Sequence, residues 1–191
     1  MKWTLSFKNI LNRMEKLLFT AHLKDNLGGK PFNETIVYCS LEEDALKLLF
    51  ISKDSAIISK GLSYNDKLYE GDTVELMITL GDRHRYLELE VNPDGVQYAA
   101  IVTKLEDGID INYVANCPFS ANTELIEGGW RSEWVIPFKN LVDLGWDKED
   151  CYFNLYRQDF QGENLKLYAL SPTECATFHR PERFIKLTIT Q

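Results

Sequence analysis

The sequence lacks the features that mark several large classes of protein. Its four cysteines, at positions 39, 117, 151 and 175, include no Cys-x-x-Cys pair and no local histidine partner, so a zinc site is not indicated. Cys39 and Cys151 fall within apolar stretches, which favours free, buried thiols and a reducing compartment. No apolar stretch approaches the ~20 residues of a membrane-spanning helix, and no signal-peptide pattern is present. These absences predict a soluble, cytoplasmic protein without a membrane partner.

Positive charge is also scarce. The 191 residues include 21 lysines and arginines against 29 acidic residues, which gives a formal net charge of −8. Such a surface repels phosphate on average, and this argues against a nucleic-acid partner. Two short basic clusters, at residues 83–85 and 179–183, are flanked by acidic residues, so the charge pattern favours solvated turns for both.

Recognisable catalytic motifs are missing as well. There is no Gly-x-Ser-x-Gly turn, and the glycine pairs at 28–29 and 128–129 lack the spacing of a phosphate-binding loop. A glycoside hydrolase acting on O-glycosyl compounds stays open as an alternative, because Glu75 and Glu88 could flank a scissile bond as acid and base. Nothing in the sequence separates an acid from a base, so we assign no catalytic residue and expect a binding protein.

The chain does contain many short β-prone stretches separated by turn residues. The Asn-Pro-Asp-Gly sequence at 92–95 predicts a hairpin between two of them. Roughly nine or ten strands are typical of a two-sheet sandwich, and no linker or repeat divides the chain. We therefore predict an all-β fold, a jelly-roll-like antiparallel β-sandwich formed by a single domain over residues 1–191. The predicted strands cover residues 35–40, 46–52, 73–80, 85–91, 96–103, 109–115, 131–136, 151–156 and 184–189.

Helical segments are few. Apolar residues three and four apart between positions 7 and about 18 predict a short N-terminal amphipathic helix or an irregular leader. Residues 137–144 predict one further helical turn. The N-terminal segment is expected to have a packing role.

Alternation within the strands predicts one apolar and one polar face. In residues 86–92 the period of two places Leu87, Leu89 and Val91 on one face and the tyrosine, glutamates and asparagine between them on the other. Residues 73–78 and 151–156 alternate in the same way. If these strands are neighbours, their polar sides combine carboxylates, an amide and flat rings, which suit the hydroxyl rim and C–H faces of a sugar. An ordinary solvated sheet face remains the alternative.

Three segments, in consistent order over about residues 17–189, resemble the family 9 carbohydrate-binding modules. The first is YEGDTVE at 69–75, and the second is EWVIPF at 133–138. The third is NLYR at 154–157 followed by FHRPERF at 178–184. The resemblance implies a non-catalytic module that binds an oligosaccharide or polysaccharide of the gluco- or xylo- class on a concave sheet face and serves carbohydrate catabolism.

The resemblance also implies the residues of the site. Glu75, Asn154 and Arg157 match the family's polar ligand contacts by position. No tryptophan lies within residues 62–72 or 160–173, where the family's two clamping tryptophans belong, so tyrosines are expected to replace them. The predicted ligand-binding residues are Glu75, Glu88, Asn154, Arg157, Tyr69, Tyr86 and Tyr168.

Other expectations concern cofactors and partners. The resemblance implies a structural calcium ion, although the loop residues Asp54, Asp66, Asp72 and Asp94 show no recognisable ligand spacing, and no metal ligand is assigned. The missing tryptophans keep open a module that has lost sugar binding and contacts a protein partner. A related haem-binding sandwich, with Met77 and His179 as conceivable iron ligands, is a less favoured alternative, as is the glycoside hydrolase.

Overall fold

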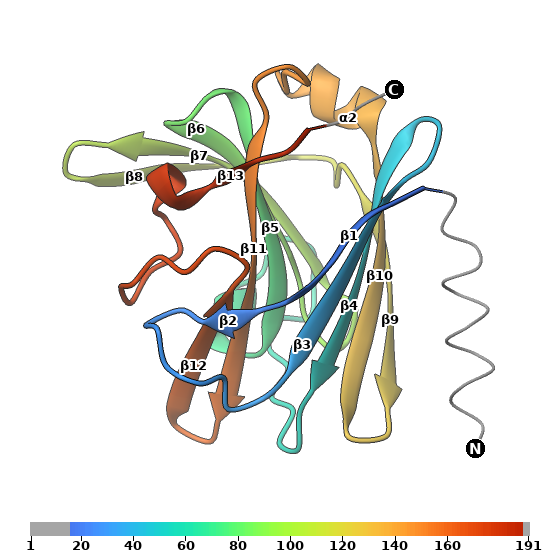
Figure 1. Cartoon of the computed structure of the whole chain (residues 1–191), viewed down its shortest axis with the longest axis vertical. Helices are drawn as coiled ribbons and strands as arrows, with labels where there is room; N and C mark the ends of the chain where they lie inside the picture. Colours follow the sequence, from blue (N-terminus) through green and yellow to red (C-terminus); the bar gives the residue numbers. More distant parts are fainter. Residues whose placement is uncertain (1–15, 189–191) are drawn as a thin grey trace.

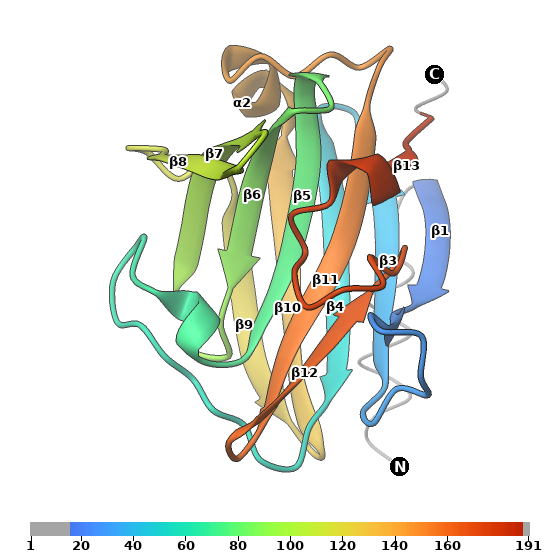
Figure 2. The same cartoon turned by 90° about the vertical axis from the view of Figure 1, so that its left-hand side faces the viewer.

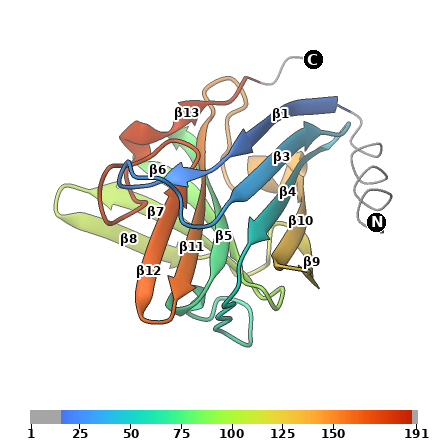
Figure 3. The same ribbon diagram turned by 60° about the horizontal axis from the view of Figure 1, so that its bottom comes forward.

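The computed structural model describes residues 16–188, which form two facing antiparallel sheets (Figure 1, Figure 3). The order of the five-stranded sheet is β1 (Lys16–His22), β3 (Thr35–Leu41), β4 (Ala45–Lys53), β10 (Gly129–Pro137) and β9 (Ser120–Ile126). In the eight-stranded sheet the order is β2 (Lys24–Asp25), β12 (Asn164–Ala169), β11 (Tyr152–Gln161), β5 (Thr73–Asp82), β6 (Arg85–Val91), β7 (Gln97–Leu105) and β8 (Gly108–Tyr113). The short strand β13 (Ile185–Lys186) pairs with β11. The predicted all-β sandwich is confirmed.

The strand count differs from the prediction, because the described residues form thirteen strands. The predicted stretches all correspond to strands, whereas β1, β2, β9 and β12 were missed. β9 and β12 are largely exposed; the sequence of β9, SANTELI, lacks a continuous apolar alternation, and that of β12, NLKLYA, alternates over only six residues. β9 is an edge strand, and β12 is paired on its outer side only through Tyr168 and Ala169, so both strands are partly buried and give a weak sequence signal.

The predicted N-terminal helix or irregular leader can be compared with the structure at its last three residues, which belong to a strand. Most of residues 7–18 lies outside the described part of the chain. The last three of these residues begin β1, where Lys16 and Leu17 pair with Leu41 and Ser40 of β3. Apolar residues at short spacing are ambiguous between helix and strand, and here the exposed backbone of β3 provides a partner.

The core lies between the two sheets and follows the alternation in the sequence. Val74, Leu76 and Ile78 of β5 point inward and are fully buried. Phe50 and Trp134 meet them from the smaller sheet, with ring centroids 5.2 Å apart. Full burial of a large apolar side chain contributes about 1.5–3 kcal/mol, so this double layer is the main stabilising element. The opposite sides of β5 and β6 face away from this core.

Two predicted local features are present. The helix α2 (Phe138–Asp143) begins directly after Pro137, in agreement with the predicted helical turn at residues 137–144. The hairpin between β6 and β7 is built on Asn92, whose side-chain oxygen accepts hydrogen bonds from the backbone of Asp94 and Val96. Gly95 has a φ of +80°, a left-handed conformation that favours glycine.

A C-terminal segment crosses the outer face of the larger sheet (Figure 2). After β12 the chain passes in front of β11 and forms the 3₁₀ turn η2 (Pro181–Arg183) before β13. Phe178 stacks on Tyr156 with ring centroids 4.2 Å apart, and Phe184 packs edge-on against Tyr86. These contacts cover one part of the face and leave the neighbouring part as a groove. Within residues 16–188, no helix has the length and apolar character needed to cross a membrane.

Candidate functional site

The candidate site is a groove on the outer face of the larger sheet, which we call the sheet groove. Its cavity volume is about 350 Å³, within the range of small-ligand sites. Strands β5, β6, β7 and β11 form its floor, the 3₁₀ turn η1 (Leu68–Glu70) contributes one wall, and residues 176–179 contribute another. Its polar and aromatic lining residues are Tyr69, Glu75, Glu88, Glu90, Tyr98, Gln158, Thr177, Phe178 and His179.

Three glutamates meet at the floor of the groove because of the strand register. Glu75 of β5 lies directly opposite Glu90 of β6, and Glu88 is two residues away on the same face. One carboxylate oxygen from each glutamate lies within 4.8 Å of the others. All three residues are at least 95% buried. The sheet therefore brings three acidic groups together in a place with little solvent.

Burial governs the acidity of these carboxyl groups. It raises the pKa of Glu75 to about 7, partly offset by hydrogen bonds from Thr73 and Gln158. It raises the pKa of Glu88 to about 8, with a further contribution from the nearby charge of Glu75. Burial and the two neighbouring carboxylates also raise the pKa of Glu90 well above its usual value.

Neighbouring polar groups hold this glutamate cluster in position. The Thr73 hydroxyl donates to Glu75 Oε1 at 2.7 Å, and Gln158 Nε2 donates to the same oxygen at 3.1 Å. His179 Nε2 lies 3.9 Å from Glu88 Oε1, while its Nδ1 shares a 2.9 Å hydrogen bond with the Tyr86 hydroxyl. Burial lowers the pKa of His179 to about 4, so this imidazole is neutral near pH 7.

Aromatic rings flank the acidic floor. Tyr69 is 48% exposed at the mouth of the groove. Tyr98 lies beside Glu90 in the adjacent strand and packs edge-on against Tyr113, with ring centroids 5.8 Å apart. Three tryptophans of the described chain, Trp130, Trp134 and Trp146, belong instead to the core. The groove therefore offers tyrosine rings as flat surfaces.

Three of the predicted ligand-binding residues line the groove, namely Tyr69, Glu75 and Glu88. Tyr86 lies on the same face but is fully buried under Phe184. Its hydroxyl is hydrogen-bonded to His179, which lines the groove. Asn154 is also fully buried: its amide nitrogen donates to the backbone carbonyl of Ser171, and its side-chain oxygen accepts from the Ser171 N–H. It attaches the C-terminal segment to β11.

Arg157 and Tyr168 require a correction, because they lie on the inner side of the sheet. Arg157 has the same parity as Phe153 and Leu155, which point into the core. Its guanidinium donates to Asp54 Oδ2 at 2.9 Å, and it lies 3.3 Å from Asp159. Tyr168 is the direct cross-strand partner of Arg157, and its hydroxyl donates to Asp159 at 3.0 Å. Arg157 also donates to the hydroxyl of Thr35 in β3 and so connects the two sheets.

Some lining residues were not among the predictions. Tyr98, Glu90 and Gln158 all face the groove. The alternation of β6 placed Glu90 on the polar face, and continuing the alternation of β11 beyond Tyr156 leads to Gln158. Tyr98 lies directly opposite Glu90 in the adjacent strand, so knowledge of the pairing of β6 with β7 would have placed it on the same face.

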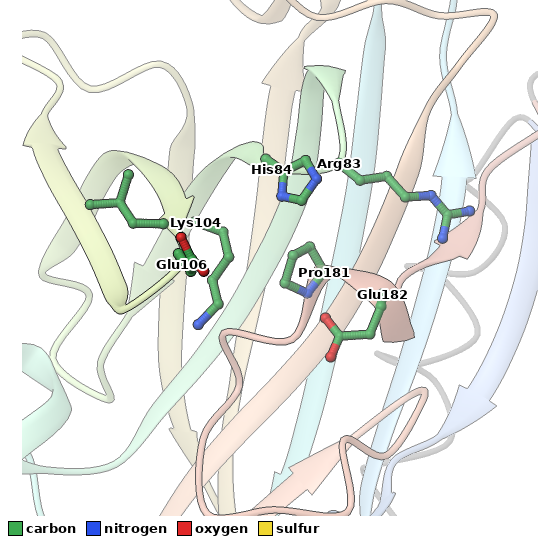
Figure 4. A pocket seen from close by; sticks show the side chains of 7 residues that line it. Arg83, His84, Lys104, Glu106, Pro181 and Glu182 are labelled. Atoms are coloured by element: carbon green, nitrogen blue, oxygen red, sulfur yellow. The ribbon is translucent and has the colours of Figure 1, made fainter.

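A second hollow lies at the far end of the same sheet, between the β5–β6 and β7–β8 turns and η2 (Figure 4). Arg83, Lys104 and Glu182 are among its lining residues. The side chain of Arg83 extends away from the others, and its guanidinium lies 3.7 Å from the ring centroid of Tyr152. The hollow carries charges of both signs, and its arginine is already in contact with the ring of Tyr152. It is therefore a weaker candidate than the sheet groove.

The residues named for the alternatives of catalysis and haem binding lie in or beside the sheet groove. Glycoside cleavage needs one protonated and one ionised carboxyl group, and the raised pKa values of the three glutamates do not by themselves assign these two roles. Met77 and His179 do both line the groove. Met77 is fully buried and packs with Tyr86 and Phe178, and both ring nitrogens of His179 face polar side chains. Their positions are explained by packing and hydrogen bonding.

Comparison with known proteins finds solved structures of similar fold but no match in sequence. No protein-family model matches the chain, and no curated protein matches it in sequence. The crystal structure of a presumed carbohydrate-binding protein from Bacteroides uniformis is similar, with a TM-score of 0.70 and 16% identity over 96% of this chain and 89% of the other.

Two further similar structures are family 9 carbohydrate-binding modules from Caldicellulosiruptor kristjanssonii. One is a complex with glucose, with a TM-score of 0.64 and 16% identity over 92% of this chain and 84% of the other. The second is a complex with cellotriose, with a TM-score of 0.55 and 15% identity over 79% and 72%. The chain thus has the fold of the family 9 carbohydrate-binding modules.

Proposed function

We propose that this chain is a non-catalytic module that binds a saccharide of the gluco- or xylo-oligosaccharide class in the sheet groove. The observation that supports this most directly is the meeting of hydrogen-bonding carboxyl and amide groups with an exposed tyrosine ring in one hollow. The fold supports it as well, since two similar structures are complexes with glucose and cellotriose.

The chemistry of the groove suits a sugar ring. Carboxyl groups of Glu75 and Glu88 accept hydrogen bonds from hydroxyls or, when protonated, also donate one. The second N–H of the Gln158 amide remains as a donor beside them. The ring of Tyr69 at the groove mouth is suited to cover a C–H face of the sugar. Because the groove volume is only about 350 Å³, we expect it to hold the end of a saccharide chain.

Isothermal titration calorimetry with cello- and xylo-oligosaccharides tests this proposal. Tyr69→Ala should weaken binding by roughly tenfold, since loss of an aromatic contact typically costs about 1–1.5 kcal/mol. Phe32→Ala is the matched control, because Phe32 is an exposed ring at 65% outside the groove. Its affinity should equal that of the wild type.

Glu75→Gln provides a second test that removes the acid but keeps the shape. We expect at least tenfold weaker binding, because the substituted amide no longer offers two acceptor oxygens to the sugar and to its supporting donors. Glu133→Gln, on the exposed side of β10 in the other sheet, is the control of equal charge. No binding by the wild type across gluco-, xylo- and manno-oligosaccharides would contradict the proposal and favour a protein partner on the same face.

A further inference from the structure

Two clusters of three acidic residues lie on opposite faces of the larger sheet, and they differ in how their charge is balanced. The first consists of Asp54, Asp72 and Asp159 on the inner side. The guanidinium of Arg157 lies 2.9 Å from Asp54 and 3.3 Å from Asp159, so a buried cation belongs to this cluster. Its ionised carboxylates are therefore compensated within the chain itself.

The second cluster, Glu75, Glu88 and Glu90, has no such compensation from the described residues. The basic group recorded near it is His179, 3.9 Å from Glu88. Its Nδ1 shares a hydrogen bond with the Tyr86 hydroxyl, and its Nε2 lies beyond hydrogen-bond distance of Glu88. Three buried carboxyl groups without a cationic partner are unfavourable when ionised, so a cation from solution would be attracted to them.

An unpartnered oxygen provides an independent observation at the same place. Glu90 Oε2 is fully buried and has no hydrogen-bond partner within residues 16–188. Buried side-chain oxygens are normally satisfied, and an exception in a native protein calls for a reason such as a bound ion. Glu75 Oε1, in contrast, accepts two hydrogen bonds. The need for a ligand is thus greatest at Glu90, on the floor of the groove.

We propose that Glu75, Glu88 and Glu90 together bind one divalent cation of the size of calcium at the floor of the sheet groove. All three offer hard carboxylate oxygens, which calcium prefers. Calcium–oxygen distances of about 2.3–2.6 Å place ligands on opposite sides of the ion about 5 Å apart. The oxygens of this cluster lie within 4.8 Å of one another, so one ion can reach them all.

The remaining coordination positions face the groove. Calcium takes about six to eight oxygen ligands, and three carboxylates supply only part of that number even when some bind through both oxygens. The others would come from water or from hydroxyl groups of a molecule in the groove. Magnesium fits less well, because it demands a nearly ideal octahedral arrangement and usually keeps several of its waters.

Calorimetric titration of calcium chloride into the metal-stripped full chain, without saccharide, tests the cation site by itself. We expect one bound ion with a Kd between about 10 µM and 1 mM, and a thermal unfolding midpoint that rises with calcium concentration. Glu90→Gln and Glu88→Gln should each weaken binding by at least about tenfold. Both variants remove a buried charge without changing shape, so they are expected to fold. Glu133→Gln should bind calcium as the wild type does.

Terbium luminescence gives a positional check, since a lanthanide in this site would lie near the ring of Tyr98 and be sensitised by it. Absence of binding heat and of any thermal shift at millimolar calcium, magnesium or manganese would overturn the proposal. Equal affinity in the wild type and Glu90→Gln would also overturn it, because the ion would then lie elsewhere. Neither result depends on whether the groove binds sugar.

Discussion

The substitution Arg157→Met tests the position of this arginine between the two sheets. The guanidinium is fully buried and donates to Asp54 and to the hydroxyl of Thr35, at 2.9 and 3.0 Å. Methionine would fill much of the volume but leave the carboxylates of Asp54 and Asp159 buried without their cation. Removal of one partner from a buried ion pair costs about 3–5 kcal/mol, so we expect a loss of that size in the free energy of unfolding.

Urea unfolding followed by far-ultraviolet circular dichroism measures this loss. With a denaturant dependence of about 2 kcal/mol per molar urea, the unfolding midpoint should fall by roughly 2 M. Arg131→Met is the matched control, because Arg131 pairs with Glu124 on an accessible surface. An exposed ion pair contributes less than about 1 kcal/mol, and the control should therefore unfold close to the wild type.

The same variant separates a structural role from a ligand-binding role. A ligand contact would lower saccharide affinity with little change in stability, whereas the buried position predicts a large loss of stability. A loss below about 1 kcal/mol, or an unchanged midpoint together with abolished saccharide binding, would refute the structural role of Arg157. Measuring affinity at low temperature, where the variant remains folded, keeps the two effects apart.

Three further predictions concern other parts of the molecule. Cys175, whose thiol pKa is lowered by hydrogen bonds and by the charge of a nearby arginine, should react first with a thiol reagent, while Cys39, whose pKa burial raises to about 12, should stay protected until unfolding. Burial raises the pKa of Asp72 to about 6; because the folded state then holds the proton more tightly, the wild type should lose up to about 3 kcal/mol relative to Asp72→Asn as the pH rises from about 4 to 6, measured by urea unfolding. Gly129→Ala should cost at least about 3 kcal/mol, because φ is +157° and the added carbon would lie 2.0 Å from the backbone oxygen of Ser52; an unchanged melting temperature would contradict this clash.

The two faces of the larger sheet were predictable because alternation is a local property. Residues such as Leu87 and Glu88 point to opposite sides whatever the rest of the fold does. The same parity argument, applied to Arg157 beside Phe153 and Leu155, would have placed it in the interior. Its polar character and its match to the family pattern suggested the opposite, and the ion pair with Asp54 explains how a charged group can lie there.

The groove itself depends on contacts that the order of residues does not reveal. Glu75 meets Glu90 through the register of one strand pair, and Gln158 arrives from a strand more than sixty residues later. The wall at residues 176–179 exists because Phe178 packs on Tyr156 and because Asn154 holds Ser171. Such pairings arise from the packing of distant segments, for which short sequence windows hold no information.

The sequence by itself determined the class of fold, the apolar side of each main strand and the presence of glutamates and tyrosines opposite the core. Turn residues and the period of two are sufficient for these conclusions, since both act over a few neighbouring residues. Only the tertiary structure decided which acidic residues pair with the guanidinium of Arg157 and which have no cationic side chain of the described chain beside them. That difference results from strand order, which places Arg157 beside Asp54 on one face and leaves Glu90 without such a partner from the described chain on the other.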